Sequence, residues 1–293
     1  MPAQSDTNGF IIVYHRKKRK KQHKQQHRND CIGVKSEFSI DSNERLTALP
    51  AGIPVVSSYF LHEIVKKLEQ CMFARRWNED WSNVKVNIFA YGIGSFLSCS
   101  SAKYQLATLL HVVKWFQCHS RVSSCCCWVF DPIWNDEERQ VIREYGALRL
   151  LKSNRQGRDC ETLGGGEEIK DQPSVTLMYM PHCGRPLYNN VLCSNWNPPR
   201  MERLTIVGNC FRSITDELVN KDQRDALGYV TAAAKMVTCE KLPPFDGHSN
   251  AFNDMCIHYF KSINLPPLVT SFWQNKSVRY PAELLREISM TSL

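Results

Sequence analysis

The sequence has no run of about 18 consecutive apolar residues, the length that a membrane-spanning helix needs, so we expect no transmembrane helix. Residues 1–8 are polar and the first basic run comes too late for a secretory signal, so we expect no leader peptide. None of the 13 cysteines is spaced Cys-x-x-Cys, the spacing of many redox and zinc motifs. These absences predict free thiols, no metal site, and a reducing compartment, namely the cytoplasm and the nucleus.

Net charge is also lacking outside one short segment. The chain carries +8 overall, and eight of its 37 Lys and Arg residues lie between His15 and Arg28, where there is no acid. The other 29 are equal in number to the 29 Asp and Glu residues, so we do not expect the folded part to bind nucleic acid through bulk charge. The basic run predicts recognition by the nuclear import machinery through Arg16 to Lys21. There are two alternatives: this tail contacts nucleic acid, or it is merely a solvated charged segment.

The pattern of apolar residues divides the chain into three parts. Residues 1–54 are predicted to form a mostly disordered tail, residues 55–275 a single core domain, and residues 276–293 a tail with a short helix at 281–288. Strands are predicted at 84–91, 125–130, 147–151, 174–180, 203–207 and 255–260, and helices at 58–76, 100–116, 135–145, 187–193, 211–220 and 222–239. Ser98 or Ser100 is expected to cap the second helix. This alternation predicts an α/β fold that is Rossmann-like, with a mostly parallel sheet flanked by helices.

Polar or glycine-containing turns follow four of the predicted strands. They are Gly92-Ile93-Gly94-Ser95, Asp131-Pro132, Pro181-His182-Cys183 and Gly208-Asn209. The carboxyl ends of parallel strands share one edge of the sheet, and open α/β folds bind ligands at that edge. We therefore predict a binding pocket there, formed by Gly92, Gly94, Ser95, Asp131, His182 and Asn209.

The glycine turn after the first strand has two interpretations. Gly92 and Gly94 either let a phosphate or an adenosyl group approach the backbone, or they serve a tight turn with positive φ. Leu97 stands where a dinucleotide fingerprint has its third glycine, and Asp131 follows Gly92 by 39 residues, whereas the fingerprint has an acid roughly 20 residues on. This argues against NAD and leaves S-adenosylmethionine or another nucleotide-like ligand as the cofactor class. Asp131 then either binds ribose hydroxyls or caps the next turn.

The pair His182 and Cys183 predicts a general base, a nucleophile, or metal ligands together with Cys193 or His258. Neighbouring side chains of an extended chain point to opposite faces, so the two are not expected to bind one metal ion. The alternative is a hydrogen-bonded histidine beside a packed thiol. Alternation likewise prevents Cys125 to Cys127 from facing one ion, and we expect these three to pack in the core.

The order of these motifs resembles the sensitivity-to-red-light-reduced family, whose animal members are called SRR-like proteins. The matching segments are Tyr91-Gly92-Ile93-Gly94-Ser95, Tyr104-Gln105-Leu106, Phe130-Asp131-Pro132, Met180-Pro181-His182-Cys183, Leu187-Tyr188-Asn189-Asn190, Asn195-Trp196, Gly208-Asn209 and Phe252-Asn253-Asp254. The resemblance implies an intracellular regulatory protein, with protein partners, that acts in circadian clock gene expression and in the regulation of haem biosynthesis. It implies no enzymatic reaction and no catalytic residue.

Two other functions stay open as alternatives. One is an S-adenosylmethionine-dependent, methyltransferase-like enzyme or another nucleotide-binding enzyme, and the other is a protein-interaction module linked to the cytoskeleton. Regulatory haem sites often contain a Cys-Pro pair, which the sequence lacks. We therefore do not expect haem to bind directly, although His182, Cys183 and His258 are candidate axial ligands.

Overall fold

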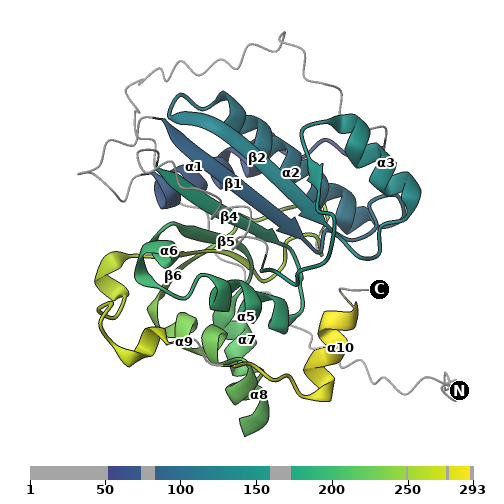
Figure 1. Ribbon diagram of the computed structural model, residues 1–293. Helices are drawn as coiled ribbons and strands as arrows, with labels where there is room; N and C mark the ends of the chain where they lie inside the picture. The colour runs from purple at the N-terminus through teal and green to yellow at the C-terminus, as the bar shows by residue number, and fades with distance from the viewer. Residues whose placement is uncertain (1–51, 74–82, 159–172, 249, 275–276, 291–293) are drawn as a thin grey trace, which may run out of the picture. The chain divides into compact units, whose positions relative to one another are not determined.

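One sheet of seven strands runs through the part of the chain that the structure describes (Figure 1). This part of the computed structural model comprises residues 52–73, 83–158, 173–248, 250–274 and 277–290, so the predicted N-terminal tail lies outside it up to residue 51. The strands are β1 (Val84–Tyr91), β2 (Val122–Phe130), β3 (Arg149–Leu150), β4 (Ser174–Met180), β5 (Leu204–Asn209), β6 (Val237–Lys241) and β7 (Met255–Phe260). Their order is β3-β2-β1-β4-β5-β7-β6; β1 to β5 are parallel to one another, whereas β7 is antiparallel to both β5 and β6. The mixed, mostly parallel sheet confirms the predicted α/β fold class.

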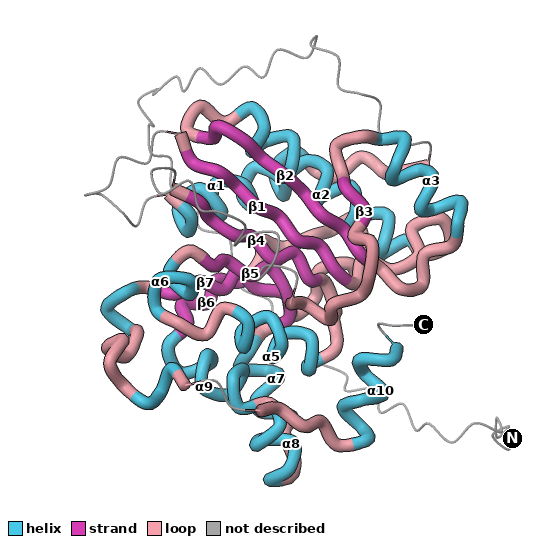
Figure 2. The backbone as a smooth tube through the Cα atoms, viewed as in Figure 1, coloured by secondary structure: helices cyan, strands magenta, loops and turns pink. Residues whose placement is uncertain are grey.

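Helices cover both faces of this sheet (Figure 2). One layer contains α1 (Ser58–Met72), α2 (Ser100–Cys118) and α3 (Asp136–Tyr145), and the other contains α5 (Arg185–Ser194), α6 (Pro198–Glu202), α7 (Phe211–Asp216) and α9 (Gly228–Met236). The side chains of β1 alternate between the layers, because Val86 and Ile88 pack with α1 and α2 whereas Phe89 and Tyr91 pack with α5 and α9.

Two further helices lie outside these layers. The helices α8 (Lys221–Ala226) and α10 (Ala282–Met290) contribute Ala226 and Leu284 to a small cluster of their own, and short 3-10 helices span Ser262–Asn264 and Ser271–Trp273. The helix α10 lies where the sequence predicts a C-terminal helix. None of the helices in the described ranges is both long and apolar enough to cross a membrane.

The starts of α3 and α2 show how the local sequence determines helix boundaries. A capping box opens α3, since the N–H of Glu138 donates to the Asn135 side chain at 2.8 Å and the N–H of Asn135 donates to Glu138 Oε2 at 3.1 Å. The predicted serine cap of α2 is wrong. Cys99 occupies the N-cap position without a side-chain hydrogen bond, and the Ser98 hydroxyl bonds to that of Ser95 at 2.6 Å instead.

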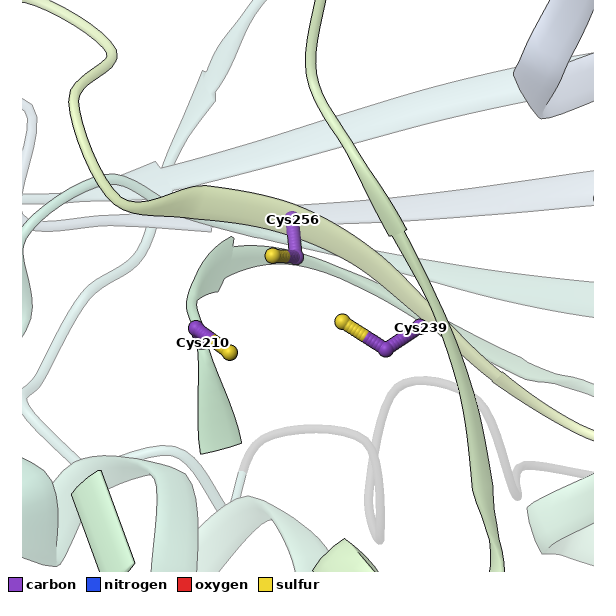
Figure 3. Close-up of side chains that lie close together, drawn as sticks. All are labelled: Cys210, Cys239 and Cys256. Atoms are coloured by element: carbon purple, nitrogen blue, oxygen red, sulfur yellow. The ribbon is translucent and has the colours of Figure 1, made fainter. Parts of the chain in front are cut away.

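The helix predicted over residues 222–239 is wrong at its C-terminal end, where the chain forms the edge strand β6. The segment forms α8 and α9 and then, from Val237 on, a strand that pairs with β7. Val237 and Thr238 are β-branched, and the ladder of hydrogen bonds offered by β7 outweighs the helical pattern of the sequence. As a result, Cys239 of β6 lies beside Cys210 and Cys256 (Figure 3).

The cysteine run in β2 is less buried than predicted. Cys127 is 1% exposed, whereas Cys125 and Cys126 are only half-buried. The short strand β3 pairs only with Trp128 and Val129, so the first half of β2 forms the edge of the sheet. Cys127 lies in the core and the half-buried Cys125 packs against it, so the core-packing prediction is confirmed for these two cysteines and not for Cys126.

Candidate functional site at the carboxyl edge of the sheet

The four predicted turns lie at one edge of the sheet, because β1, β2, β4 and β5 are parallel neighbours. Since β7 runs in the opposite direction, the turn that precedes it, with Asp254, reaches the same edge. The strand order changes direction between β1 and β4, which is where doubly wound folds bind their ligands. The turns after β1 and β4 therefore decide whether a cofactor has room.

The Cys183 side chain occupies the space between these two turns. Gly92 has φ +67°, and a Cβ atom on it would lie 2.5 Å from Cys183 Sγ. The thiol donates to the Tyr91 carbonyl at 3.3 Å, and burial raises its pKa well above the ordinary value, so it is protonated and unsuited to act as a nucleophile. The hollow that Pro132 and Leu187 line beside this contact measures about 10 Å³, close to the space of one water molecule. These contacts support the tight-turn interpretation of Gly92.

The backbone of Gly94 is likewise engaged within the protein. Its N–H donates to Asp131 Oδ2 at 2.7 Å, and its carbonyl accepts from Trp134 Nε1 at 2.8 Å. The second carboxylate oxygen, Oδ1, accepts from the Ile133 N–H at 3.1 Å. Burial raises the pKa of Asp131, which is 4% exposed, and the two backbone hydrogen bonds oppose that rise. Asp131 thus closes the two turns, as in the capping interpretation.

A second buried acid, which sequence reasoning missed, holds the rest of the glycine turn. Glu138 is fully buried and accepts from the Ser95 hydroxyl at 2.7 Å and from the Leu97 N–H at 3.1 Å. The available signal was the Asn135-x-x-Glu138 spacing at a helix start, which marks a capping box. Ser95 therefore serves to connect the glycine turn to α3.

Asn209 connects the end of β5 to the turn after β4. Its Oδ1 accepts from the His182 N–H at 3.1 Å, its Nδ2 donates to the Cys183 carbonyl at 3.4 Å, and its N–H donates to Tyr188 Oη at 2.9 Å. His182 has φ +52° and is exposed, with its Nε2 3.3 Å from the Ala251 carbonyl oxygen. The structure thus combines a surface histidine with a packed thiol at this turn.

In the described part of the chain, neither His182 nor Cys183 belongs to a group of three or more side chains that could bind one metal ion. His258, proposed as a partner, is buried, and its Nε2–H donates to the Asn209 carbonyl at 3.0 Å. The three side chains that do lie together are Cys210, Cys239 and Cys256.

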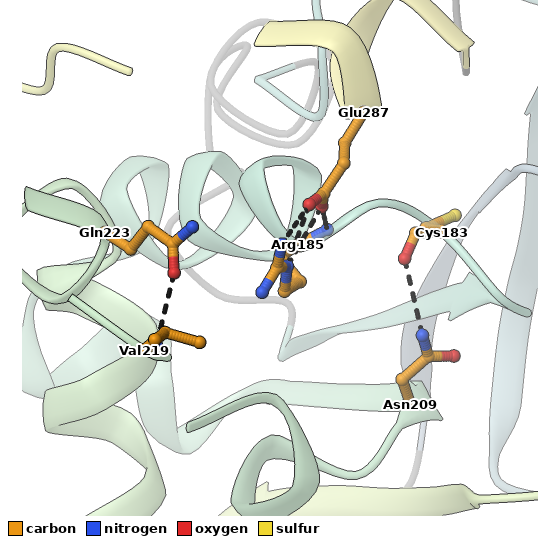
Figure 4. A network of polar contacts seen from close by, with 6 residues as sticks. All are labelled: Cys183, Arg185, Asn209, Val219, Gln223 and Glu287. Atoms are coloured by element: carbon orange, nitrogen blue, oxygen red, sulfur yellow. Dashed lines mark hydrogen bonds and ion pairs between the residues drawn. The ribbon is translucent and has the colours of Figure 1, made fainter. Parts of the chain in front are cut away.

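A cavity of about 410 Å³ opens beside Asn209. Its charged lining consists of Arg185, Glu217, Asp254 and Glu287. The Arg185 backbone N–H and Nε each donate to the Glu287 carboxylate at 2.9 Å, so α10 is bound to the start of α5 (Figure 4). This pairing leaves Glu217 and Asp254 as the excess charge, and the cavity suits a basic or polar ligand.

A second hollow, of about 310 Å³, lies beside Asp131 and has the opposite charge. Arg139, Arg143 and Lys152 line it. The six predicted residues share one edge of the sheet. Among these three spaces, Asn209 lines the first cavity, Asp131 the second and Gly92 the narrow hollow beside Cys183.

The fold and this edge define a doubly wound α/β protein in which the Cys183 side chain fills the space between the turns after β1 and β4. Residues 62–259 match the family model of the SRR1 domain. The match covers more than half of the chain, so the chain belongs to the SRR1-domain family, as its motifs indicate.

Three relatives extend this assignment. An SRR1-like protein of Mus musculus is 33% identical over 152 residues, which are 52% of this chain and 55% of the relative. An SRR1-like protein of Drosophila melanogaster is 27% identical over 179 residues (61% and 56%), and the Arabidopsis thaliana protein SENSITIVITY TO RED LIGHT REDUCED 1 is 26% identical over 190 residues (62% and 61%). The chain thus spans less than two thirds of the length of each of these relatives.

Proposed function

We propose that this SRR1-domain protein is a regulatory protein that acts in circadian clock gene expression and in the regulation of haem biosynthesis. The observation that carries the proposal is the family match over residues 62–259, which contains all six residues of the predicted pocket. The Arabidopsis relative is named for reduced sensitivity to red light, in keeping with a regulatory role. The filled space between the turns after β1 and β4 favours regulation through protein partners over turnover of a cofactor.

The enzyme alternative is favoured by the fold and disfavoured by the site. The sheet is doubly wound, and open α/β sheets bind ligands at the carboxyl ends of their strands, but a fold does not determine function. Here the Gly94 N–H is held by Asp131, and Gly92 is covered by Cys183. Calorimetric titration of S-adenosylmethionine into the purified chain tests this alternative. Saturable binding that Asp131→Asn weakens would establish a cofactor site and contradict our preference.

We assign partner binding to the cavity of about 410 Å³ beside Asn209. Its lining contains three acids and one arginine, so it suits a basic segment of a regulatory protein; a cytoskeletal protein is the alternative partner. Ser213→Arg on α7 places a long cation in this cavity, and Asp216→Arg on the same helix is a matched control because Asp216 does not line it.

Rescue of cells that lack the protein tests the function and the surface separately. Wild type and the Asp216→Arg variant are expected to restore the rhythm of clock-gene transcripts and the haem content, and Ser213→Arg is expected to fail. A Ser213→Arg variant that rescues fully would exclude the cavity as the partner site. If depletion of the wild-type protein changes neither the rhythm nor the haem content, the proposed function itself is wrong.

We also propose that the protein occurs in both cytoplasm and nucleus, with import through Arg16 to Lys21, which lie outside the described residues. Six consecutive basic residues are a typical import signal. A fluorescent fusion that lacks residues 16–21 is expected to lose its nuclear fraction. An unchanged distribution would show that the tail has another role.

A further inference from the structure

Three cysteines from separate parts of the sequence converge at the antiparallel end of the sheet (Figure 3). Cys210 joins β5 to α7, Cys239 lies in β6, and Cys256 lies in β7. Their Sγ atoms all lie within 4.8 Å of one another, and the close-up shows the three sulfurs pointing into a common space.

The register of the sheet brings these thiols together. Cys256 pairs with Gly208 of β5 on one side and with Lys241 of β6 on the other. Cys210 follows Gly208 by two residues and Cys239 precedes Lys241 by two. Residues that pair directly across neighbouring strands share a face of the sheet, and so do residues two apart along a strand. Cys210 and Cys239 therefore lie on the same face as Cys256. The cluster is therefore a product of regular strand pairing.

We propose that Cys210, Cys239 and Cys256 form a three-thiolate site for a thiophilic d10 ion, Zn²⁺ or Cu⁺. Since the sulfurs are within 4.8 Å of one another, a central point lies at most ~2.8 Å from each, and an inward shift of about 0.5 Å reaches the usual Zn–S distance of about 2.3 Å. Soft thiolates select these ions over Mg²⁺ or Ca²⁺, which prefer oxygen ligands.

The surroundings of the cluster are rigid on one side and open on the other. The His258 ring, directly opposite Cys239 in the register, is fully buried and stacks on Phe211 at 4.0 Å. Cys256 is 1% exposed, whereas Cys239 is exposed. An ion can thus enter from the Cys239 side, and a fourth ligand position faces solvent, as in zinc sites that keep one position open.

A bound ion would join β6 to β5 and to the start of α7. The edge strand would then depend on the ion for part of its stability, because an ion that binds only the folded state stabilises it. This site departs from the sequence prediction of no metal. Its ligands are separated by 29 and 17 residues, so no local spacing pattern announces it.

Titration of the full-length protein with Co²⁺, a spectroscopic substitute for Zn²⁺, tests the site. The protein is reduced with a phosphine under anaerobic conditions, and we expect a thiolate-to-cobalt charge-transfer band that saturates at one equivalent and is abolished by Zn²⁺. Cys210→Ser, Cys239→Ser and Cys256→Ser should each weaken binding at least about tenfold, the lower range for losing even an outer-shell partner of a metal. Cys118→Ser, at an exposed cysteine at the end of α2, is the matched control and should bind as the wild type does.

A parallel titration with Cu⁺ separates the two ions. Binding of Cu⁺ but not of Zn²⁺, with the same dependence on the three cysteines, supports the site and identifies it as a copper site. Absence of the charge-transfer band with Co²⁺ together with absence of Cu⁺ binding overturns the proposal, and so does a band that survives in the triple serine variant. The proposal is also overturned if the intact mass shows a disulfide within the cluster and the protein still binds neither ion after reduction. The wild-type spectrum reports thiolate ligation directly, so the test does not depend on the variants folding.

Discussion

Replacing Gly92 by alanine tests whether the turn after β1 is packed or open. The new Cβ would lie 2.5 Å from Cys183 Sγ, and its residue would keep φ near +67°. The left-handed backbone costs about 1–2 kcal/mol for a residue with a Cβ atom, and forcing an extra carbon into a packed site costs about 1–3 kcal/mol. Lower entropy of the unfolded chain offsets about 0.4–1 kcal/mol. We therefore expect Gly92→Ala to lower the free energy of unfolding by about 1–5 kcal/mol.

A double-mutant cycle isolates the steric part of this loss. In a Cys183→Ala background the sulfur is gone and Cys183 Cβ, at 3.8 Å, makes an ordinary contact, so Gly92→Ala should cost only about 1 kcal/mol. Gly94→Ala is the control: it also has positive φ, but its Cβ would meet only Ala102 Cβ at 3.5 Å. Its cost should be the same in both backgrounds. Urea unfolding followed by far-ultraviolet circular dichroism measures all six proteins. A Gly92→Ala cost that is unchanged by Cys183→Ala would refute the packed-turn argument and reopen this space for a ligand.

Three other predictions follow from the polar contacts. Glu287→Gln should weaken the docking of α10 by about 1 kcal/mol and speed the proteolysis of this helix. Glu283→Gln, on the exposed side of the helix, should change neither. Equal proteolysis rates for the two variants would contradict the role of the Arg185–Glu287 pair. Because burial raises the pKa of Asp131, its carboxyl favours the folded state at low pH and loses that contribution as the pH rises through the pKa. The stability of wild type relative to Asp131→Asn should therefore fall with rising pH in thermal melts, and an opposite slope would be inconsistent. Tyr188→Phe should cost about 1–3 kcal/mol in urea unfolding, because the Met180 carbonyl and the Asn209 N–H both lose their hydrogen bond to the hydroxyl. A neutral effect would show that water replaces the hydroxyl.

Much of the fold follows from the sequence pattern. The bounds of β1, β4 and β7 agree with prediction to the residue, because each is a buried apolar run between clear turn signals. The segment around β6 does not, since a short amphipathic stretch near a helix end has no local signal for an edge strand. Its conformation is set by hydrogen bonds to β7, a strand that follows β6 only after a loop.

The candidate site, like the fold, was only partly predictable from the sequence. The sequence by itself determined that the glycine, Asp131, His182 and Asn209 turns share one edge, because the alternation of strands and helices forces parallel strands. Only the tertiary structure decided what those turns do. Whether Gly92 faces a ligand or a thiol depends on the rotamer of Cys183, 91 residues away, and the three-cysteine cluster depends on the register of β5, β6 and β7. Such contacts between distant residues are set by packing in three dimensions, and local periodicity along the chain carries no information about them.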